Sequence, residues 1–576
     1  MQQAIKSRSF KTNILTLAIC TALYGCNDSS SNDPVVNDDT TPGATEPGSN
    51  SPDATTPDDK TVTVVNPDIG GGKILFYTTA GAFIDSANVG NLPDMVEFAS
   101  ATSLVVANEG EPEDDYVADD EGSISIITLS ADKTVLDVKT LGFTDDMLDG
   151  DVRIKPGSDA QHDLEPEYVA VNAQGTQAWV TLQENNAVAM VDLTTQSISK
   201  VKSLGKIAIK DQAMDITDDG AANPVVGNPD NIFALYMPDT LQAVTIAGQD
   251  YYVTANEGDD REYGDYEDLE KAKDLEDDAE DSLLSAQLQT DLLDTDAKKL
   301  RVLKDLGKNT DGIYDELYMT GTRSFTIWSA DGARVFDSGS EFEAEIAVNY
   351  SASFNTRVDD TDDADDIQEL VDDGVPHEMV GDTAFFFEGV DARSLKKGVE
   401  PEALAIHKIG DKTFAYIGLE KQGGMFVYDI STPAASTMVE YVNDIDYTAL
   451  PTAAGDLAPE GMVAFEQDSK HYLAVANELS STLALYELAT DGRATKLISL
   501  SLGGFDTGAA EIVDYSPQDK KLFVTNAETQ KVDVIDVSTP ATAAKVSSID
   551  FSAYADDLQS VSVKDGVLAI AVKRKD

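Results

Sequence analysis

The sequence predicts an all-β fold, a seven-bladed β-propeller whose ring is closed by N- and C-terminal half-blades. Three observations support this prediction. A unit of four short strands recurs about every 40–50 residues. The two ends of the chain carry complementary halves of that unit. The segments that interrupt the third unit are acidic and partly helical, so we expect them to cap one face of the propeller.

Most units combine a proline beside an acidic residue, an apolar strand, a turn, a second strand that ends at an acid, and two further strands. The complete units begin at Leu92, Glu165, Met237, Glu400, Ala458 and Ala510. Their later strands, such as Ser123–Ile127 and Met425–Tyr428, are rich in β-branched and aromatic residues, as half-buried strands are. Four strands at this spacing are typical of one propeller blade.

The ends of the globular part each hold half a unit. Ile74–Tyr77 and Phe83–Asp85 match the second half, whereas Ser560–Val563 and Val567–Val572 match the first half. Together they would complete a seventh blade and hide strand edges that are otherwise exposed. The alternative is an open repeat array with ragged, unpaired ends.

The charge of the chain limits its partners. Asp and Glu number 105 against 41 Lys and Arg, which gives a formal net charge of −64. Such a surface repels phosphate backbones and attracts cations, so we expect no nucleic-acid binding. With 2 cysteines in all, the chain can form neither a disulfide scaffold nor a cysteine zinc cluster.

Residues 1–25 are predicted to be a lipoprotein signal peptide, because a basic start precedes the short apolar run Ile14–Leu23. The run Leu23–Cys26 resembles the bacterial lipobox, in which the chain is cut before the cysteine and its thiol is lipidated. Cys26 would then be the anchor, and an ordinary secretory signal is the alternative. Asn27 favours sorting to the outer membrane, so we expect a bacterial cell-envelope protein, either an outer-membrane lipoprotein or a cell-surface one.

Residues 26–72 are rich in Ser, Pro and Asp and hold few large apolar side chains, so we expect a disordered acidic tether. The propeller then spans residues 73–576, with insertions at 258–320 and 340–399. No later run reaches the roughly 18 apolar residues of a membrane span. We therefore expect membrane contact only through the lipid anchor.

The two insertions differ in pattern. The first contains Leu284, Leu288 and Leu292 at helical spacing. The second contains the acidic run Asp359–Asp366, which we interpret as a solvated loop. Both should emerge at the face where the acids of the repeat gather.

Acidic residues recur at the start of the innermost strand and at the end of the second strand of each unit. Because neighbouring strands are antiparallel, these two positions lie at the same face. Eleven carboxylates should therefore converge on one mouth of the channel. They are Asp94, Glu109, Glu167, Glu184, Asp239, Glu257, Glu402, Glu420, Glu460, Glu478 and Glu511. The seventh blade departs from the pattern with Ser560.

Like charges at this density require protons or bound cations. Carboxylates, together with amide oxygens from Asn108, Asn256 and Asn477, are typical ligands of a hard cation. We expect Ca²⁺ as the cofactor, with Mg²⁺ as the alternative. Another interpretation stays open, in which each acid caps backbone amides at its strand end and recurs because the blade recurs.

Arg261 and Arg323 are the candidate anion-binding residues, since an arginine beside metal-bound carboxylates can hold a phosphate in a bidentate fork. The alternative is that each is a local counter-ion for the acids. The chain has no G-x-S-x-G, H-E-x-x-H, P-loop or C-x-x-C motif, so the sequence names no catalytic residue.

Six segments carry a resemblance to a known family: Val106–Pro112, Asp163–Tyr168, Thr254–Asp259, Arg323–Trp328, Glu400–Glu402 and Gly418–Glu420. They resemble the choice-of-anchor I family, which is similar to the mesenchyme-specific cell-surface glycoproteins of echinoderm biomineralisation. The resemblance covers about residues 73–576 and implies a surface-anchored, WD40/YVTN-like propeller. In that family the unit resembling Gly508–Phe551 usually comes first, so the order here looks circularly permuted.

These observations predict a lipid-anchored, extracytoplasmic surface propeller that binds divalent cations and an extracellular ligand or mineral ion. The alternative is a metal-dependent phosphoesterase acting on a phosphate ester, because bacterial members of the family often carry alkaline-phosphatase labels. In that case the mouth would hold the metal, and Arg261 or Arg323 would hold the phosphate.

Overall fold

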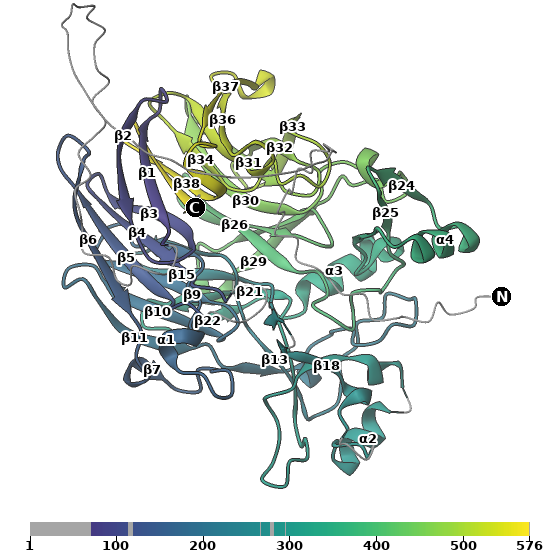
Figure 1. Ribbon diagram of the computed structural model, residues 1–576. Helices are drawn as coiled ribbons and strands as arrows, with labels where there is room; N and C mark the ends of the chain where they lie inside the picture. The colour runs from purple at the N-terminus through teal and green to yellow at the C-terminus, as the bar shows by residue number, and fades with distance from the viewer. Residues whose placement is uncertain (1–70, 113–118, 265, 277–280, 294, 575–576) are drawn as a thin grey trace, which may run out of the picture. The chain divides into compact units, whose positions relative to one another are not determined.

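The computed structural model describes residues 71–574 apart from 113–118, 265, 277–280 and 294 (Figure 1). The predicted signal peptide, the cysteine anchor and nearly all of the predicted tether lie outside this part of the chain. The prediction of an all-β fold is confirmed, because strands dominate and form a series of small, mainly antiparallel sheets. None of the helices described is long and apolar enough to cross a membrane.

Across the described ranges, six sheets have four strands and a seventh large sheet has five. The first meander contains β3 (Pro93–Ser100), β4 (Ser103–Asn108), β5 (Ser123–Leu129) and β6 (Val135–Gly142). The next contains β8 (Val169–Val171), β9 (Gln177–Leu182), β10 (Ala187–Asp192) and β11 (Ser197–Ser203), with β7 (Leu148–Asp149) parallel to β11. The third contains β14 (Leu241–Ile246), β15 (Gln249–Asn256), β21 (Ser324–Ser329) and β22 (Arg334–Asp337).

Three further meanders follow the second insertion. They are β26 (Pro401–Ile409), β27 (Lys412–Leu419), β28 (Met425–Asp429) and β29 (Thr437–Val442); β30 (Pro459–Gln467), β31 (Lys470–Asn477), β32 (Thr482–Leu488) and β33 (Ala494–Ser501); and β34 (Val513–Ser516), β35 (Lys521–Asn526), β36 (Lys531–Asp536) and β37 (Ala544–Asp550). The first strand of each meander lies where the sequence repeat predicts it.

The remaining large sheet joins the two ends of the described chain. It contains β1 (Lys73–Thr78), β2 (Phe83–Asn88), β38 (Ala555–Lys564) and β39 (Val567–Arg574) in the order β2–β1–β39–β38. Antiparallel pairing sets Lys73 opposite Val572 and Thr78 opposite Val567. The expected pairing of the terminal strands is therefore present.

The terminal sheet packs on both of its neighbours, as the alternation of side chains along a strand allows. Ile74 and Phe76 of β1 lie in one buried cluster with residues of the β3–β6 sheet. Leu75 and Tyr77, at the intervening positions, lie in another cluster with residues of the β34–β37 sheet such as Phe523. Both clusters also take side chains from β39.

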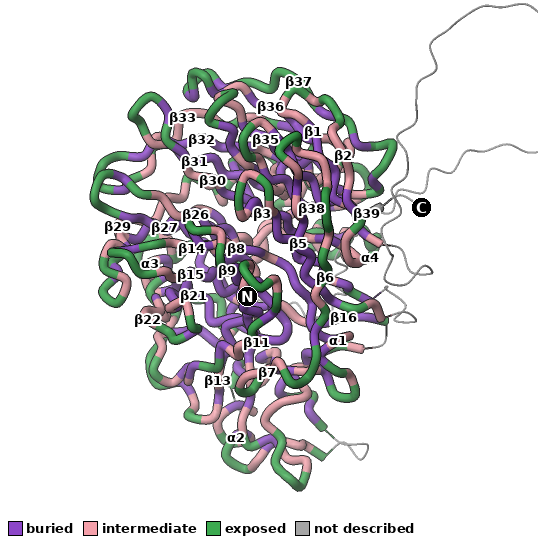
Figure 2. The backbone as a smooth tube through the Cα atoms, turned by 90° about the vertical axis from the view of Figure 1, so that its left-hand side faces the viewer, coloured by how far each residue is buried: buried purple, intermediate pink, exposed green. Residues whose placement is uncertain are grey.

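The first strands of the large sheets contact one another in succession. β3 contacts β38 and β8, β14 contacts β8 and β26, and β30 contacts β26 and β34. β34 in turn contacts β38. Figure 2 shows β3, β8, β14, β26 and β38 near the middle of the view, with later strands such as β29 and β37 farther out. Each first strand therefore lies between two others.

The first insertion and the segment before β14 form structure of their own. The segment before β14 contains β12 (Lys206–Ala208) and β13 (Ile232–Leu235). The first insertion contains β16 (Glu262–Tyr263), β17 (Tyr266–Glu267), β18 (Leu269–Lys271), α2 (Ala286–Leu292), β19 (Arg301–Leu303) and β20 (Leu317–Met319). The helical spacing of Leu288 and Leu292 corresponds to α2, with both side chains buried, and Leu284 lies just before it. The sequence did not predict the sheet β12–β13–β20.

The second insertion contains α3 (Glu341–Asn349), β23 (Val358–Thr361), α4 (Ala364–Asp373), β24 (His377–Val380) and β25 (Thr383–Phe387). The prediction that Asp359–Asp366 is a loop was wrong, because the run spans most of β23 and the start of α4. Asp363 explains the helix start, since its side chain accepts hydrogen bonds from the backbone N–H groups of Asp365 and Asp366. Gly374 ends α4 in the left-handed conformation, with φ of 70°.

Short helical turns complete the description. The α-helix α1 (Ala160–Asp163) precedes β8. The 3₁₀ turns are Asp145–Met147, Ile209–Asp211, Ala272–Asp274, Asp296–Lys299, Ser351–Ser353, Pro433–Ala435, Pro451–Ala453, Ala527–Thr529 and Pro540–Thr542.

Candidate metal centre

The predicted carboxylates flank the same ends of the first and second strands. Pro93 of β3 pairs with Asn108 of β4, and besides burial the negative charge of the neighbouring Asp94 acts on the carboxyl group of Glu109 and raises its pKa. The same register recurs between β26 and β27 and between β30 and β31. We call the eleven predicted carboxylates the acidic mouth.

Three members of the mouth come from three different sheets and meet at one point. Asp239, Glu402 and Glu460 each offer one carboxylate oxygen, and these oxygens all lie within 4.8 Å of one another. We call these residues the central trio. All three side chains are half-buried. Burial, and then neighbouring carboxylates, raise the pKa of Glu402 and Glu460 well above the ordinary value. Burial also raises the pKa of Asp239 to about 7.

Asp94 and Glu167 extend the central trio on one side. Burial and the negative charge of Asp239 raise the pKa of Asp94 to about 8. Burial, followed by the charges of Glu184 and Asp239, raises the pKa of Glu167 well above the ordinary value. Glu167 is 8% exposed, and its Oε2 is a buried atom without a hydrogen-bond partner. The Oε2 atom of Glu402 is likewise buried and has no hydrogen-bond partner.

The hydrogen bonds of the mouth bear on the capping interpretation. Within the described residues, no backbone N–H donates to the carboxylates of Asp94, Glu167, Glu402, Glu460 or Glu511. Backbone capping therefore does not account for these five acids.

The other acids of the mouth form links between neighbouring sheets. Burial and the charges of Glu111 and Asp94 raise the pKa of Glu109 well above the ordinary value. Burial is the main cause that raises the pKa of Glu184 and of Glu478. Burial, and then the charges of Glu478, Asp557 and Asp94, raise the pKa of Glu511. The Glu511 carboxyl therefore interacts with an acid of the first meander, Asp94.

A second trio lies beside the first and has a different charge balance. Carboxylate oxygens of Glu257, Glu400 and Glu420 also lie within 4.8 Å of one another. We call these residues the lateral trio. The Lys397 ammonium donates to Glu257 Oε1 at 2.6 Å and lies 3.4 Å from Glu400 Oε2. Lys421 forms an ion pair with Glu420.

The sequence reasoning missed Glu400 and its basic partners as members of the site. Glu400 is fully buried, and Arg393 Nε donates to its Oε1 at 2.8 Å. Burial opposes ionisation, but Arg393, Lys397 and Lys421 together hold the pKa of Glu400 below its usual range. The only sequence signal was the run Glu400–Glu402, where two acids flank a proline.

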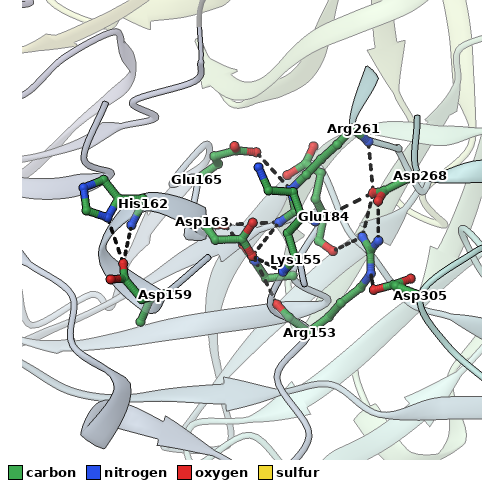
Figure 3. A network of polar contacts seen from close by, with 12 residues as sticks. Arg153, Lys155, Asp159, His162, Asp163, Glu165, Glu184, Arg261, Asp268 and Asp305 are labelled. Carbon is green, nitrogen blue, oxygen red and sulfur yellow. Dashed lines mark hydrogen bonds and ion pairs between the residues drawn. The ribbon is translucent and has the colours of Figure 1, made fainter. Parts of the chain in front are cut away.

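Arg261 lies in a buried network of ion pairs (Figure 3). Its Nη2 lies 3.2 Å from Asp163 Oδ2, its Nη1 3.7 Å from Asp268 Oδ2, and its Nε 3.9 Å from Glu165 Oε2. Arg153, which the sequence reasoning missed, donates through Nη1 and Nη2 to Asp268 at 2.8 and 2.5 Å. Arg261 is thus surrounded by acids of the protein itself.

Both terminal nitrogens of Arg323 donate to acceptors of the protein itself. Its Nη1 donates to Glu343 Oε1 at 2.6 Å and to the backbone oxygen of Asp215 at 2.7 Å. Its Nη2 donates to the backbone oxygens of Ser394 and Lys396 at 2.7 and 2.9 Å. This geometry favours the counter-ion interpretation of Arg323, in which the residue fastens the second insertion to the β14–β22 sheet.

The asparagine amides that we expected at the mouth bond within the sheets. Asn256 Nδ2 donates to Ser324 Oγ and Thr326 Oγ1 on β21, and its Oδ1 accepts from Thr254. Asn108 Nδ2 likewise donates to residues of β5. Asn477 Nδ2 donates to backbone oxygens of Val475 and Thr482. These amides connect second and third strands.

The model of the choice-of-anchor I domain matches residues 54–433. The chain belongs to the choice-of-anchor I family. The resemblance stated from the sequence segments is thus confirmed, over a range that includes Asp239 and Glu402 and ends before Glu460.

This choice-of-anchor I protein is 28% identical over 158 residues to Gigasin-3a of Magallana gigas. The match covers 27% of this chain and 46% of Gigasin-3a, so the chain spans about half the length of that curated relative.

Two solved structures are similar over most of the chain. The periplasmic gluconolactonase PpgL of Pseudomonas aeruginosa has 12% sequence identity and a TM-score of 0.42, covering 83% of this chain and 96% of its own. The β-propeller domain of Cps50 (Swd1) of Myceliophthora thermophila has 8% identity and a TM-score of 0.35, covering 84% of this chain and 97% of its own.

Proposed function

We propose that this choice-of-anchor I protein is a surface-anchored, extracytoplasmic propeller that binds a divalent cation in its acidic mouth. The central trio of Asp239, Glu402 and Glu460 is the observation that carries this proposal. Ca²⁺ is the cation we favour, because all the donors are carboxylate oxygens, and Mg²⁺ is the alternative.

The spacing of the central trio suits a hard cation. Oxygens that bind Ca²⁺ at 2.3–2.6 Å are at most about 5 Å apart across the ion. The trio oxygens, all within 4.8 Å of one another, meet this limit. A bound cation would also offset the mutual repulsion of the carboxylates and supply a partner to the buried Oε2 atoms of Glu167 and Glu402.

We propose that the large sheets are the seven blades of a closed ring. The successive contacts between first strands and the shared sheet of the two chain ends support this arrangement. A closed ring would hold Asp239, Glu402 and Glu460, which belong to separate sheets, at fixed distances. A rigid frame reduces the cost of assembling charged ligands around an ion.

We further propose that lipidated Cys26 anchors the protein at the outer membrane or cell surface, as the lipobox resemblance implies. The cation would then serve as the contact point for an extracellular ligand or a mineral ion. Cys26→Ser should abolish lipid labelling of the protein in cells.

Calcium-dependent stability tests the cation proposal. Ca²⁺ at about 100 times its Kd should stabilise the folded protein by about 2.7 kcal/mol, a rise in Tm of about 3 °C relative to chelator. The pair Asp239→Asn with Glu402→Gln should remove this rise. It should also stabilise the metal-free protein, because two like charges are lost. The exposed pair Asp137→Asn with Glu369→Gln is the matched control and should behave like the unmodified protein.

Two results would contradict the cation proposal. One is a calcium-induced rise that survives in the central-trio variant. The other is an absence of any rise in the unmodified protein at millimolar Ca²⁺ and Mg²⁺. The phosphoesterase alternative is assayed on the same samples, because it requires metal-dependent phosphate release from a generic ester.

A further inference from the structure

Lys397 places a positive charge inside the lateral trio. Its Nζ lies 2.6 Å from Glu257 Oε1, 3.2 Å from Asp259 Oδ1 and 3.4 Å from Glu400 Oε2. The side chain is 14% exposed. Burial disfavours the ammonium, but the charges of Asp259, Glu257 and Glu400 hold the pKa of Lys397 well above its usual value. Lys397 is therefore charged.

The contacts of Lys397 resemble the first coordination sphere of an ion. Three carboxylates lie within 3.4 Å of one nitrogen: Glu257 and Asp259 from one segment, and Glu400 from the segment of Lys397 itself. In the sequence, 140 residues separate Lys397 from Glu257. Among the described residues, Glu400 Oε2 is a buried atom that accepts no hydrogen bond, and Lys397 Nζ lies 3.4 Å from it. That oxygen could accept a closer and stronger cation.

Charge counting defines which cation would replace the ammonium. Four carboxylates surround this position: Glu257, Asp259, Glu400 and Glu420. Three cationic side chains pair with them: Arg393, Lys397 and Lys421. Burial raises the pKa of Glu257 to about 8, against the charge of Lys397. With all four carboxylates ionised, the formal sum is −1 with Lys397 and −2 without its charge, so one divalent cation would neutralise the ionised position.

The central trio provides the contrast. The charges that act most strongly on Glu402 and Glu460 are those of other carboxylates. Within the described residues, no ion pair joins a Lys or Arg to Asp239, Glu402 or Glu460. The oxygens of both trios lie within the same 4.8 Å limit, but among the described residues a Lys or Arg forms ion pairs with the lateral trio alone.

We propose that Lys397 is a tethered cation that occupies a second divalent-cation position formed by Glu257, Glu400 and Glu420. This inference rests on the proposed function for the type of ion, a hard divalent cation such as Ca²⁺. Lys397 lies near the end of the second insertion, so the returning segment of that insertion closes the position. The wild-type mouth then binds one ion fewer than its carboxylates permit.

The experiment counts bound Ca²⁺ by equilibrium dialysis and calorimetry in the wild type and in Lys397→Gln. We expect one additional Ca²⁺ per molecule in Lys397→Gln. Adding Glu257→Gln to this variant should return the number to the wild-type value. Lys412→Gln, which removes an exposed lysine paired with Asp429, is the matched control and should leave the number unchanged.

The outcomes separate this inference from the proposed function. One extra ion in Lys397→Gln supports the tethered cation, even if the wild type binds none and the central-trio proposal fails. Equal numbers in wild type and Lys397→Gln overturn the tethered cation, whether or not the wild type binds Ca²⁺.

A melting experiment decides the case in which Lys397→Gln is poorly folded. The variant should be less stable than the wild type in chelator, and saturating Ca²⁺ should restore its Tm to within about 2 °C of the calcium-bound wild type. A loss of stability that Ca²⁺ does not restore would show that Lys397 is only a structural ion-pair partner.

Discussion

Glu97 shows how burial controls a single carboxyl group outside the mouth. It lies on β3, where burial and then the charge of Asp514 on β34 raise its pKa to about 8, although Lys564 opposes the shift. A carboxyl with a raised folded-state pKa stabilises the protein when protonated, and that contribution is lost as pH rises. For Glu97 the loss should extend from about pH 4.5 to pH 8.

Glu97→Gln should therefore stabilise the protein at pH 9 and leave it unchanged at pH 4.5. We expect a gain on the order of 2 kcal/mol, below the full linkage value because the side chain is only half-buried. Urea unfolding at the two pH values measures it, with exposed Glu466→Gln as the control. Equal effects of Glu97→Gln at both pH values would mean that Glu97 titrates normally.

The two candidate anion-binding arginines illustrate what residue identity alone leaves open. Arg261 and Arg323 were candidates because they are cations in an acidic region. Their environments depend on acceptors far along the chain, such as Asp163 for Arg261 and Ser394 for Arg323. A phosphate would have to compete with these acceptors for the same N–H groups.

At the scale of elements, the first insertion is fastened to the propeller by Asp268. Its carboxylate accepts two hydrogen bonds from Arg153 and one from the backbone N–H of Arg261, and Tyr266 donates to it at 2.7 Å. Asp268 is buried next to β18. Removing its charge would leave two buried guanidinium groups with incomplete compensation.

Asp268→Asn should loosen the first insertion without unfolding the sheets. We expect a local destabilisation of about 3 kcal/mol, seen as faster hydrogen exchange in β17 and β18 and faster proteolysis within residues 258–320. Glu267→Gln alters the neighbouring exposed acid and should have no such effect. Faster exchange throughout all the large sheets would contradict a local role.

The elements also show where sequence patterns are informative. Leu284, Leu288 and Leu292 predicted a helix because the helical period places them on one face, and Leu288 and Leu292 lie in α2, which begins after Leu284. The acidic run Asp359–Asp366 led to a wrong prediction of a loop, because charge alone does not specify backbone conformation. Acidic residues are favourable at the capped start of a helix. The sheet β12–β13–β20 joins segments more than 80 residues apart, for which no local pattern exists.

At the scale of the whole molecule, the terminal sheet should govern global stability. Deleting residues 558–576 removes β39 and most of β38 and exposes the clusters on both sides of β1. If the sheets form a closed ring, the loss should lower the Tm of the entire domain by about 10 °C or more, or prevent folding. Differential scanning calorimetry of the truncated protein measures it, and an unchanged Tm would rule out the closed ring.

A circular permutant is the control for this deletion. Joining residue 576 to residue 71 by a flexible linker and opening the chain between β2 and β3 keeps all four strands of the terminal sheet. The register places Lys73 opposite Val572, so the joined ends already lie side by side. The permutant should melt within a few degrees of the wild type.

The sequence by itself determined the strands and the rows of carboxylates. Strand positions follow from a period of two and from repetition, both of which are local properties. Asp94 and Glu109 belong to one hairpin, so antiparallel pairing places them at the same end of it. Membership of the choice-of-anchor I family could likewise be stated from short segments of the chain.

Only the tertiary structure decided how each carboxylate is compensated. It brought Asp239, Glu402 and Glu460 from three sheets to one point, and it placed Lys397 in the lateral trio beside them. The partner of a buried charge is selected by the path of aperiodic insertions, because the Coulomb energy depends on distance in space and not on spacing along the chain. The repeated acids of the sequence thus contribute to one trio that has no basic side chain paired with it among the described residues, and to a second trio, completed by Glu400, that is paired with Lys397.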